Sequence, residues 1–119
     1  MLLDLTLVES ITMTDLVQQL ANELAVRPNQ VTAAIALIDE GASVPFIARY
    51  RKEVTQGLDD TQLRQLDTRL TYLRDLFDRR EKVLESLKEQ DKLSDDLLAR
   101  VNAAETKHAL EEIYAPYRP

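Results

Sequence analysis

Leucines recur at alternating intervals of three and four residues between positions 59 and 90, which is the longest hydrophobic pattern in the sequence. The series comprises Leu63, Leu66, Leu70, Leu73, Phe77, position 80, Leu84 and Leu87, and Arg80 interrupts it once. Such spacing aligns side chains along one face of a helix. Asp59 and Gln62 match a capping box, and neither glycine nor proline occurs between Gly57 and Pro116. The pattern predicts one long helix over about 59–90.

Shorter helical patterns lie on both sides of this segment. They are predicted at about 14–25, 28–40, 45–52, 94–104 and 106–114. Their ends are marked by the N-cap candidates Thr14, Ser94 and Thr106, by Pro28 and Pro45 in first turns, and by Gly41 at a helix stop. No segment shows the alternation of a strand. The predicted fold is all-α, a helical bundle organised around one long helix with several shorter helices.

Residues 1–13 have neither a helix cap nor a usable periodicity. We interpret them as a peripheral extension or an expression scar. The helical domain is therefore predicted over 14–119.

The leucine series fits either a homodimeric coiled coil or the core of a single bundle. Leu76 and Val83 widen the apolar stripe beyond a two-stranded seam, which favours a bundle core. A 59–90 helix would be about 48 Å long, whereas a compact domain of this size is about 35 Å across. If the shorter helices cover its ends, the middle of the helix stays exposed. Leu70, Leu73, Leu76 and Phe77 are thus a candidate interaction face, through which we expect self-association.

Composition argues against several classes of function. The chain has a net charge of −6, 30% charged residues and no cysteine, so disulfides and thiolate metal sites are excluded. No apolar run approaches the roughly 20 residues that span a bilayer, which favours a cytoplasmic protein without membrane contact. The single histidine, His108, has no nearby partner for catalysis or zinc binding, and two glycines cannot form a phosphate loop. We predict no enzyme, no catalytic residues, no metal and no cofactor.

The segment after Gly41 concentrates basic and aromatic residues. Arg49, Tyr50, Arg51 and Lys52 are candidate nucleic-acid contacts, because cations bind phosphates and an aromatic ring stacks on bases. In the structural alternative, Pro45, Phe46, Ile47 and Tyr50 are buried against the bundle, Arg49 faces the packing side, and the arginines bond carboxylates or helix carbonyls. The structural alternative is favoured for Arg49, and the two remain equal for Arg51 and Lys52.

Residues 21–31 superficially match a helix-turn-helix, with 28–40 as the recognition helix. Asn29 and Gln30 could read bases, but Asp39 and Glu40 would face phosphates unfavourably. A pair of helices that simply pack together is the better interpretation.

Three stretches together resemble one known family. They are Val44–Glu53, with the sequence VPFIARYRKE, Gly57–Arg64, with GLDDTQLR, and Tyr114–Pro119, with YAPYRP. In this combination and order the chain is similar to the N-terminal region of the Tex-like transcription accessory proteins. The resemblance covers about residues 16–119.

The resemblance implies that the chain is a truncated part of a larger protein. Members of that family join a helical N-terminal region to a helix-turn-helix segment, a ribonuclease-H-like (YqgF) module, a helix-hairpin-helix and an S1 domain, to which nucleic-acid binding is chiefly attributed. The implied function is a non-enzymatic helical scaffold segment. Its implied partners are the remaining domains of the parent and, through them, nucleic acid. A helix-turn-helix-like nucleic-acid-binding module that uses Arg49, Arg51 and Lys52 is the alternative.

Overall fold

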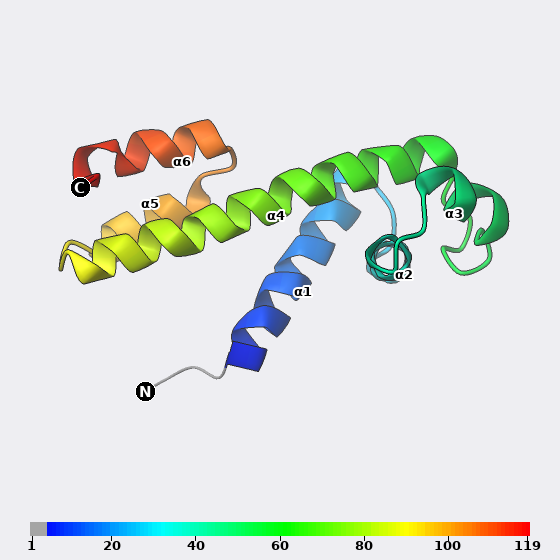
Figure 1. The fold of residues 1–119 in the computed structure, drawn as a ribbon, viewed down its shortest axis with the longest axis horizontal. Helices are drawn as coiled ribbons and strands as arrows, with labels where there is room; N and C mark the ends of the chain where they lie inside the picture. Colours follow the sequence, from blue (N-terminus) through cyan, green and yellow to red (C-terminus); the bar gives the residue numbers. More distant parts are fainter. Residues whose placement is uncertain (1–4) are drawn as a thin grey trace. The chain divides into compact units, whose positions relative to one another are not determined.

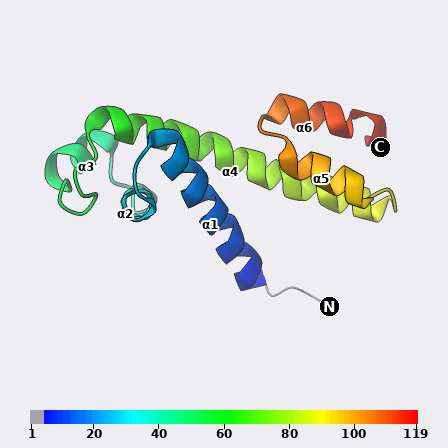
Figure 2. The ribbon, with the colours of Figure 1, turned by 180° about the vertical axis from the view of Figure 1, so that it is seen from behind.

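A computed structural model describes the backbone of residues 5–119 and the side chains of residues 13–119. Within that range the chain is all-α, with six α-helices, a short 3-10 helix and no strand (Figures 1 and 2). The elements are α1 (Leu5–Leu24), α2 (Pro28–Asp39), α3 (Val44–Tyr50), α4 (Asp60–Glu89), α5 (Asp95–Ala103), α6 (Lys107–Tyr114) and η1 (Ala115–Tyr117). The predicted fold class, with one long helix and several shorter ones, is confirmed.

The start of α4 has the predicted capping box. The Asp59 carboxylate accepts a hydrogen bond from the Gln62 backbone N–H at 2.8 Å, and the Gln62 side chain accepts one from the Asp59 N–H at 2.9 Å. These two bonds satisfy backbone donors that a helix start otherwise leaves unpaired. The helix then runs for 30 residues, as the leucine pattern predicted.

Three other predicted helix ends, at Ser94, Thr106 and Gly41, are also found. The Ser94 hydroxyl accepts from the Leu97 N–H at 3.1 Å and caps α5, and the Thr106 hydroxyl accepts from the Ala109 N–H at 3.0 Å and caps α6. Gly41, with φ +98°, follows the end of α2 in a backbone conformation that L side chains rarely adopt. These local signals were sufficient to place the three helix boundaries.

The prediction for the first helix was wrong at its start. The helix α1 begins at Leu5, and Thr14 lies inside it rather than at its N-cap. A helix can extend through this segment because residues 1–27 contain no glycine or proline. Residues 1–4, and the side chains up to residue 12, lie outside the described part of the chain. The peripheral role of residues 1–13 therefore stays a prediction.

The chain divides into two compact units, the first ending at Leu73 and the second formed by Arg74–Pro119. In the first unit α1 packs on α2, and α2 contacts α3. Its buried core includes Leu16, Leu20, Val31, Ile35, Ile47, Leu58, Leu63 and Leu66. Arg69 of α4 donates two hydrogen bonds to the Glu23 carboxylate, at 2.7 and 3.0 Å, which ties α4 to the end of α1.

In the second unit α5 packs on α6, and both contribute to a core with the later part of α4. The buried side chains include Val83, Leu87, Leu97, Val101 and Leu110. The Ser86 and Tyr114 hydroxyls are hydrogen-bonded at 2.6 Å, and Arg79 bonds Glu111 in a two-point contact. The burial of Leu76 and Val83 confirms that the leucine stripe belongs to a bundle core.

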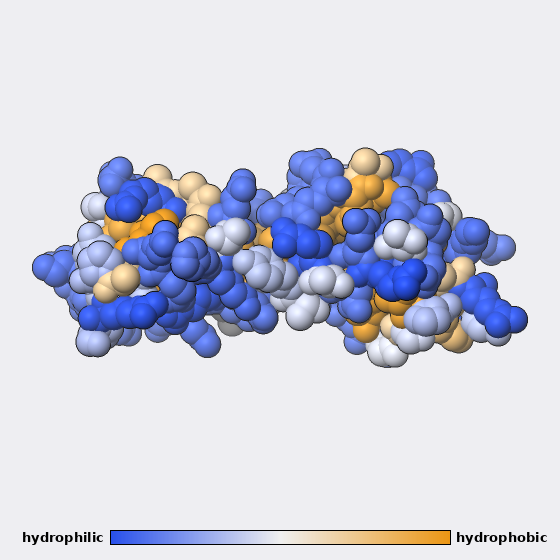
Figure 3. Space-filling model, turned by 90° about the horizontal axis from the view of Figure 1, so that it is seen from above, coloured by the Kyte–Doolittle hydropathy of each residue, from blue (hydrophilic) through white to orange (hydrophobic). Residues whose placement is uncertain are grey.

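The predicted exposure of the mid-helix face was wrong. Leu70, Leu73, Leu76 and Phe77 are all buried, with at most 9% of each residue exposed. The shorter helices do not merely cover the ends of α4: α1 reaches Arg69, and α6 reaches Asp75 through Lys107 at 3.2 Å. On the face drawn in Figure 3, the hydrophobic residues that reach the surface gather in small separate areas. Because these side chains are buried, self-association through this face is no longer expected.

Candidate interaction surface

The short helix α3 is held to the first unit by one side chain. The Ser43 hydroxyl accepts from the Phe46 N–H at 3.3 Å and caps the helix, and Pro45 lies in its first turn. Ile47 is the buried residue of α3 and is fully buried. A seven-residue helix with a single buried residue leaves most of its surface to solvent.

The structure contradicts the predicted burial of the aromatic residues. Phe46 is 40% exposed and Tyr50 is 58% exposed, and Pro45 is also at the surface. Arg49 is exposed too, so it does not face the packing side. The reason is that the chain anchors itself beyond the helix instead, through the buried Thr55 and Leu58.

The exposed residues form one patch of aromatic, aliphatic and basic side chains. We call it the α3 patch and define it as Phe46, Arg49, Tyr50, Arg51, Lys52 and Val54. The Phe46 and Tyr50 rings are 5.2 Å apart, since they are one helical turn from each other. Arg51 lies 5.0 Å from the Phe46 ring centroid and Arg49 lies 5.4 Å from that of Tyr50, within the range of cation–π attraction. All four side chains thus order one another.

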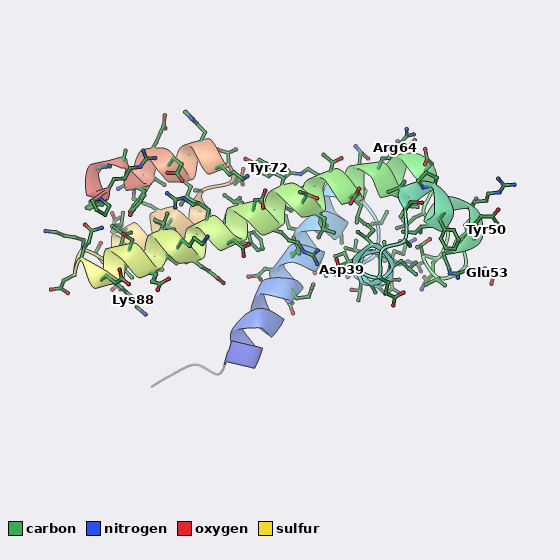
Figure 4. The ribbon with its side chains drawn as sticks, in the orientation of Figure 1. Asp39, Tyr50, Glu53, Arg64, Tyr72 and Lys88 are labelled. Atoms are coloured by element: carbon green, nitrogen blue, oxygen red, sulfur yellow. The ribbon has the colours of Figure 1, made fainter. Side chains whose placement is uncertain are left out.

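The cations of the α3 patch differ from the arginines of α4 that form ion pairs. Arg64, Arg69 and Arg79 each form an ion pair with a carboxylate. Among the described residues, no such pair is formed by Arg49, Arg51 or Lys52, although Arg51 does donate to the Tyr50 carbonyl at 3.1 Å. In Figure 4, Tyr50 and the nearby Glu53 lie at the surface of the segment formed by α3 and the turn after it. The α3 patch therefore carries positive charge that the fold does not neutralise.

The turn that follows α3, residues 51–57, is fixed by bonds within it. The Gly57 N–H donates to the Lys52 carbonyl at 2.9 Å. The fully buried Thr55 donates its N–H to the Arg51 carbonyl, and its hydroxyl donates to the Lys52 carbonyl. Gln56 and Gly57 have φ values of +56° and +95°. Such a network holds Lys52 and Val54 in place on the surface.

Gln30 of α2 connects this turn to the helix pair, a role that the sequence did not reveal. Its Nε2 donates to the carbonyls of Thr55 and Gln56 at 3.4 and 3.1 Å, and its Oε1 accepts from the Arg27 N–H at 2.9 Å. The side chain is nearly buried, at 9% exposure. Gln30 is therefore occupied within the fold and does not face outward to read bases, which supports the interpretation of α1 and α2 as a packed pair.

Charged pairs join helices within each of the two units. A hydrogen bond from Arg79 lowers the pKa of the Glu111 carboxyl most strongly; burial opposes it, and a hydrogen bond from Arg118 lowers the pKa further. A hydrogen bond from Arg69 lowers the pKa of Glu23 in the same way. These shifts keep both carboxylates ionised for pairing between helices.

His108 lies at the surface of α6, with its Nε2 3.0 Å from the Glu112 carboxylate. In the part of the chain that the structure describes, no group of acidic or histidine residues could hold a metal ion. Over the same residues, no helix is long and apolar enough to cross a membrane.

Comparison with known proteins agrees with the resemblance seen in the sequence. The family model described as the Tex-like protein N-terminal domain matches residues 14–88. The matched residues contain α2, α3, nearly all of α4 and the α3 patch. The chain belongs to the Tex-like family and contains its N-terminal domain.

Several curated proteins are similar over most of the chain. Transcriptional accessory protein Tex of Neisseria gonorrhoeae is 61% identical over 100 residues, and protein YhgF of Escherichia coli is 59% identical over 100 residues; each match covers 84% of this chain. The human S1 RNA-binding domain-containing protein 1 is 32% identical over 104 residues, or 87% of this chain. The chain spans 13% of the length of the two bacterial relatives and 10% of the human one.

Proposed function

We propose that this chain acts as a non-enzymatic helical scaffold segment of a Tex-like transcription accessory factor. The role of Gln30 supports this most strongly, since the side chain best suited to base reading is used to hold the turn after α3. The pairs Arg69–Glu23 and Arg79–Glu111 likewise join helices to one another. The polar chemistry of the domain is thus directed mainly at its own rigidity.

In this proposal the parent protein works in the cytoplasm and binds nucleic acid chiefly through an S1 domain outside these 119 residues. The name of the human relative, an S1 RNA-binding domain-containing protein, supports that assignment, as does the name of the gonococcal one, a transcriptional accessory protein. The scaffold would then interact with the remaining domains of the parent and with nucleic acid only through them.

A second candidate function is nucleic-acid binding by Arg49, Arg51 and Lys52. The observation in its favour is that these exposed cations form no ion pair among the described residues. Against it stands the net charge of −6, with a pI near 4.8, because nucleic-acid-binding domains usually have a basic face and a high pI. Three cations also neutralise few phosphates.

Titration of a fluorescein-labelled twelve-nucleotide oligouridylate with the chain tests the proposal. We expect weak binding near physiological salt, with a log–log salt slope no steeper than about −2, since each neutralised phosphate of a single strand contributes about −0.7. Sub-micromolar binding that is lost in the double variant Arg51→Glu, Lys52→Glu would establish the second candidate function instead.

A further inference from the structure

The α3 patch contains most of the large hydrophobic residues that are exposed in the described part of the chain. Phe46, Tyr50 and Val54 are three of the five large hydrophobic residues that are exposed in the described part of the chain, and they lie within nine positions. Single exposed apolar residues are common, but a cluster marks a contact site. The exposed fractions of 40%, 58% and 49% leave enough of each side chain free to be covered by a ligand.

The charge of the α3 patch indicates what that ligand carries. Arg49, Arg51 and Lys52 face solvent beside the rings, and Glu53 is the acidic residue among them. Three cations and one carboxylate within five positions make this a locally positive site on a chain of net charge −6, and no ion pair within the described residues neutralises Arg49, Arg51 or Lys52. Electrostatic complementarity therefore calls for a ligand with several negative charges.

The combination of residues favours a protein ligand over a nucleic acid. Tyrosine and arginine are the residues that most often dominate protein–protein binding energy, and an aliphatic residue such as Val54 has no specific use against bases or phosphates. A long polyanion would also meet the repulsion of the acidic chain as a whole, whereas a short acidic segment contacts the patch alone. We propose that the α3 patch binds a short protein segment in which Asp or Glu residues flank large apolar side chains.

The rigidity of the site supports this proposal. The turn that carries Lys52 and Val54 is fixed by the bonds of Thr55 and Gly57, and Gln30 links that turn to α2. The cation–π contacts hold Arg49 and Arg51 beside the rings. Because these contacts restrict the side chains of the site before binding, docking costs the site less conformational entropy. The proposal rests on the scaffold function, to which it adds the chemical class of the partner.

Fluorescence anisotropy with defined probes tests the proposal on the complete 119-residue chain. The probe is a fluorescein-labelled twelve-residue peptide in which Asp and Glu flank two Leu and one Phe. The matched probe has Lys in place of every acidic residue, and twelve-nucleotide oligouridylate is the nucleic-acid probe. We expect the acidic peptide to bind at least about tenfold more tightly than either of the other two, as opposite charge and apolar contact act together.

Variants then locate the binding site. Tyr50→Ala, and separately Arg51→Glu with Lys52→Glu, should each weaken binding of the acidic peptide at least about tenfold, as expected for hot-spot residues. Lys88→Glu, an exposed cation of α4 in the second unit, should change it less than about twofold, because rim or remote charges contribute little. Far-UV circular dichroism confirms folding, and the milder pair Arg51→Ala, Lys52→Ala replaces any reversal variant that does not fold.

The outcomes separate this proposal from the scaffold function. If neither peptide binds, if the Lys peptide binds as well as the acidic one, or if the α3 patch variants bind like the unaltered chain, the docking proposal is wrong. In those cases weak oligouridylate binding still leaves the scaffold function standing. Sub-micromolar oligouridylate binding through Arg51 and Lys52 would overturn both.

Discussion

Replacement of Gln30 by Ala tests whether this side chain holds the domain together. The change removes a donor to the Thr55 and Gln56 carbonyls and an acceptor for the Arg27 N–H. A base-reading residue could be removed with little effect on stability. A residue that links α2 to the turn after α3 could not.

The structure sets the size of the expected effect. A hydrogen bond contributes about 0.5–1.5 kcal/mol net, and a buried carbonyl left without its donor costs about 1–3 kcal/mol. The hydrogen bond to the Thr55 carbonyl is long, at 3.4 Å, and Gln56 is exposed and so can bond to water. The summed cost of losing the Gln30 hydrogen bonds therefore lies toward the lower end of these ranges. We expect Gln30→Ala to lower the free energy of unfolding by about 2 kcal/mol, or roughly 8 °C in Tm for a domain of this size.

Urea denaturation followed by circular dichroism measures the change in stability. Asn29→Ala is the matched control, because Asn29 is the adjacent residue in the same helical turn and is exposed, so its removal should cost no more than about 0.5 kcal/mol. Amide hydrogen exchange provides a local readout. The Gly57 N–H, which donates to the Lys52 carbonyl, should exchange faster in Gln30→Ala than in the control.

Equal stabilities for the two variants would refute this reasoning. They would show that the hydrogen bonds of Gln30 make no net contribution to the stability of the fold. Gln30 would then again be a candidate for reading bases from α2. A loss of stability without faster exchange at Gly57 would place the effect in α2 itself rather than in the turn.

Four further predictions concern the core, a helix end, pH and the N-terminus. Leu73→Ala should lower the free energy of unfolding by about 2–5 kcal/mol in urea denaturation, because Leu73 is fully buried. Ala25→Gly should raise it by about 0.5–1 kcal/mol in the same assay, since Ala25 has φ +55° at the end of α1. The pKa of Glu111 is lowered from its ordinary value of 4.5, so its ion pairing stabilises the fold above pH 4.5 and this stabilisation is lost as the pH falls toward the folded-state pKa. Glu111→Gln should therefore make the Tm decline less steeply as the pH is lowered. Deletion of residues 1–13 should shift the Tm by no more than a few degrees, and a larger fall would contradict their peripheral role.

The parts of the fold that depend on neighbouring residues were predictable from the sequence. The capping box of Asp59 and Gln62 and the stop at Gly41 follow from bonds and backbone angles within a few positions. The α1 start was missed because Thr14 was interpreted as an N-cap, whereas the absence of glycine and proline from residues 1–27 was the better signal.

The candidate site was only partly predictable, because burial depends on where distant helices lie. The sequence identified Arg49, Tyr50, Arg51 and Lys52 as one chemical group, but periodicity could not tell that Phe46 and Tyr50 face outward. Similarly, nothing local shows that a glutamine at position 30 reaches carbonyls 25 and 26 residues away. Long-range contacts of this kind require the three-dimensional structure.

In our proposals the α3 patch serves protein docking in a scaffold and does not bind nucleic acid itself. Amide NMR spectra of the ¹⁵N-labelled chain, recorded with increasing acidic peptide or with increasing oligouridylate, test both points most directly. We expect the peptide to shift the amide signals of residues 46–56, whereas oligouridylate at the same concentrations should leave them in place. Shifts of these signals by oligouridylate, with none by the peptide, would show that the α3 patch binds nucleic acid and not an acidic protein segment.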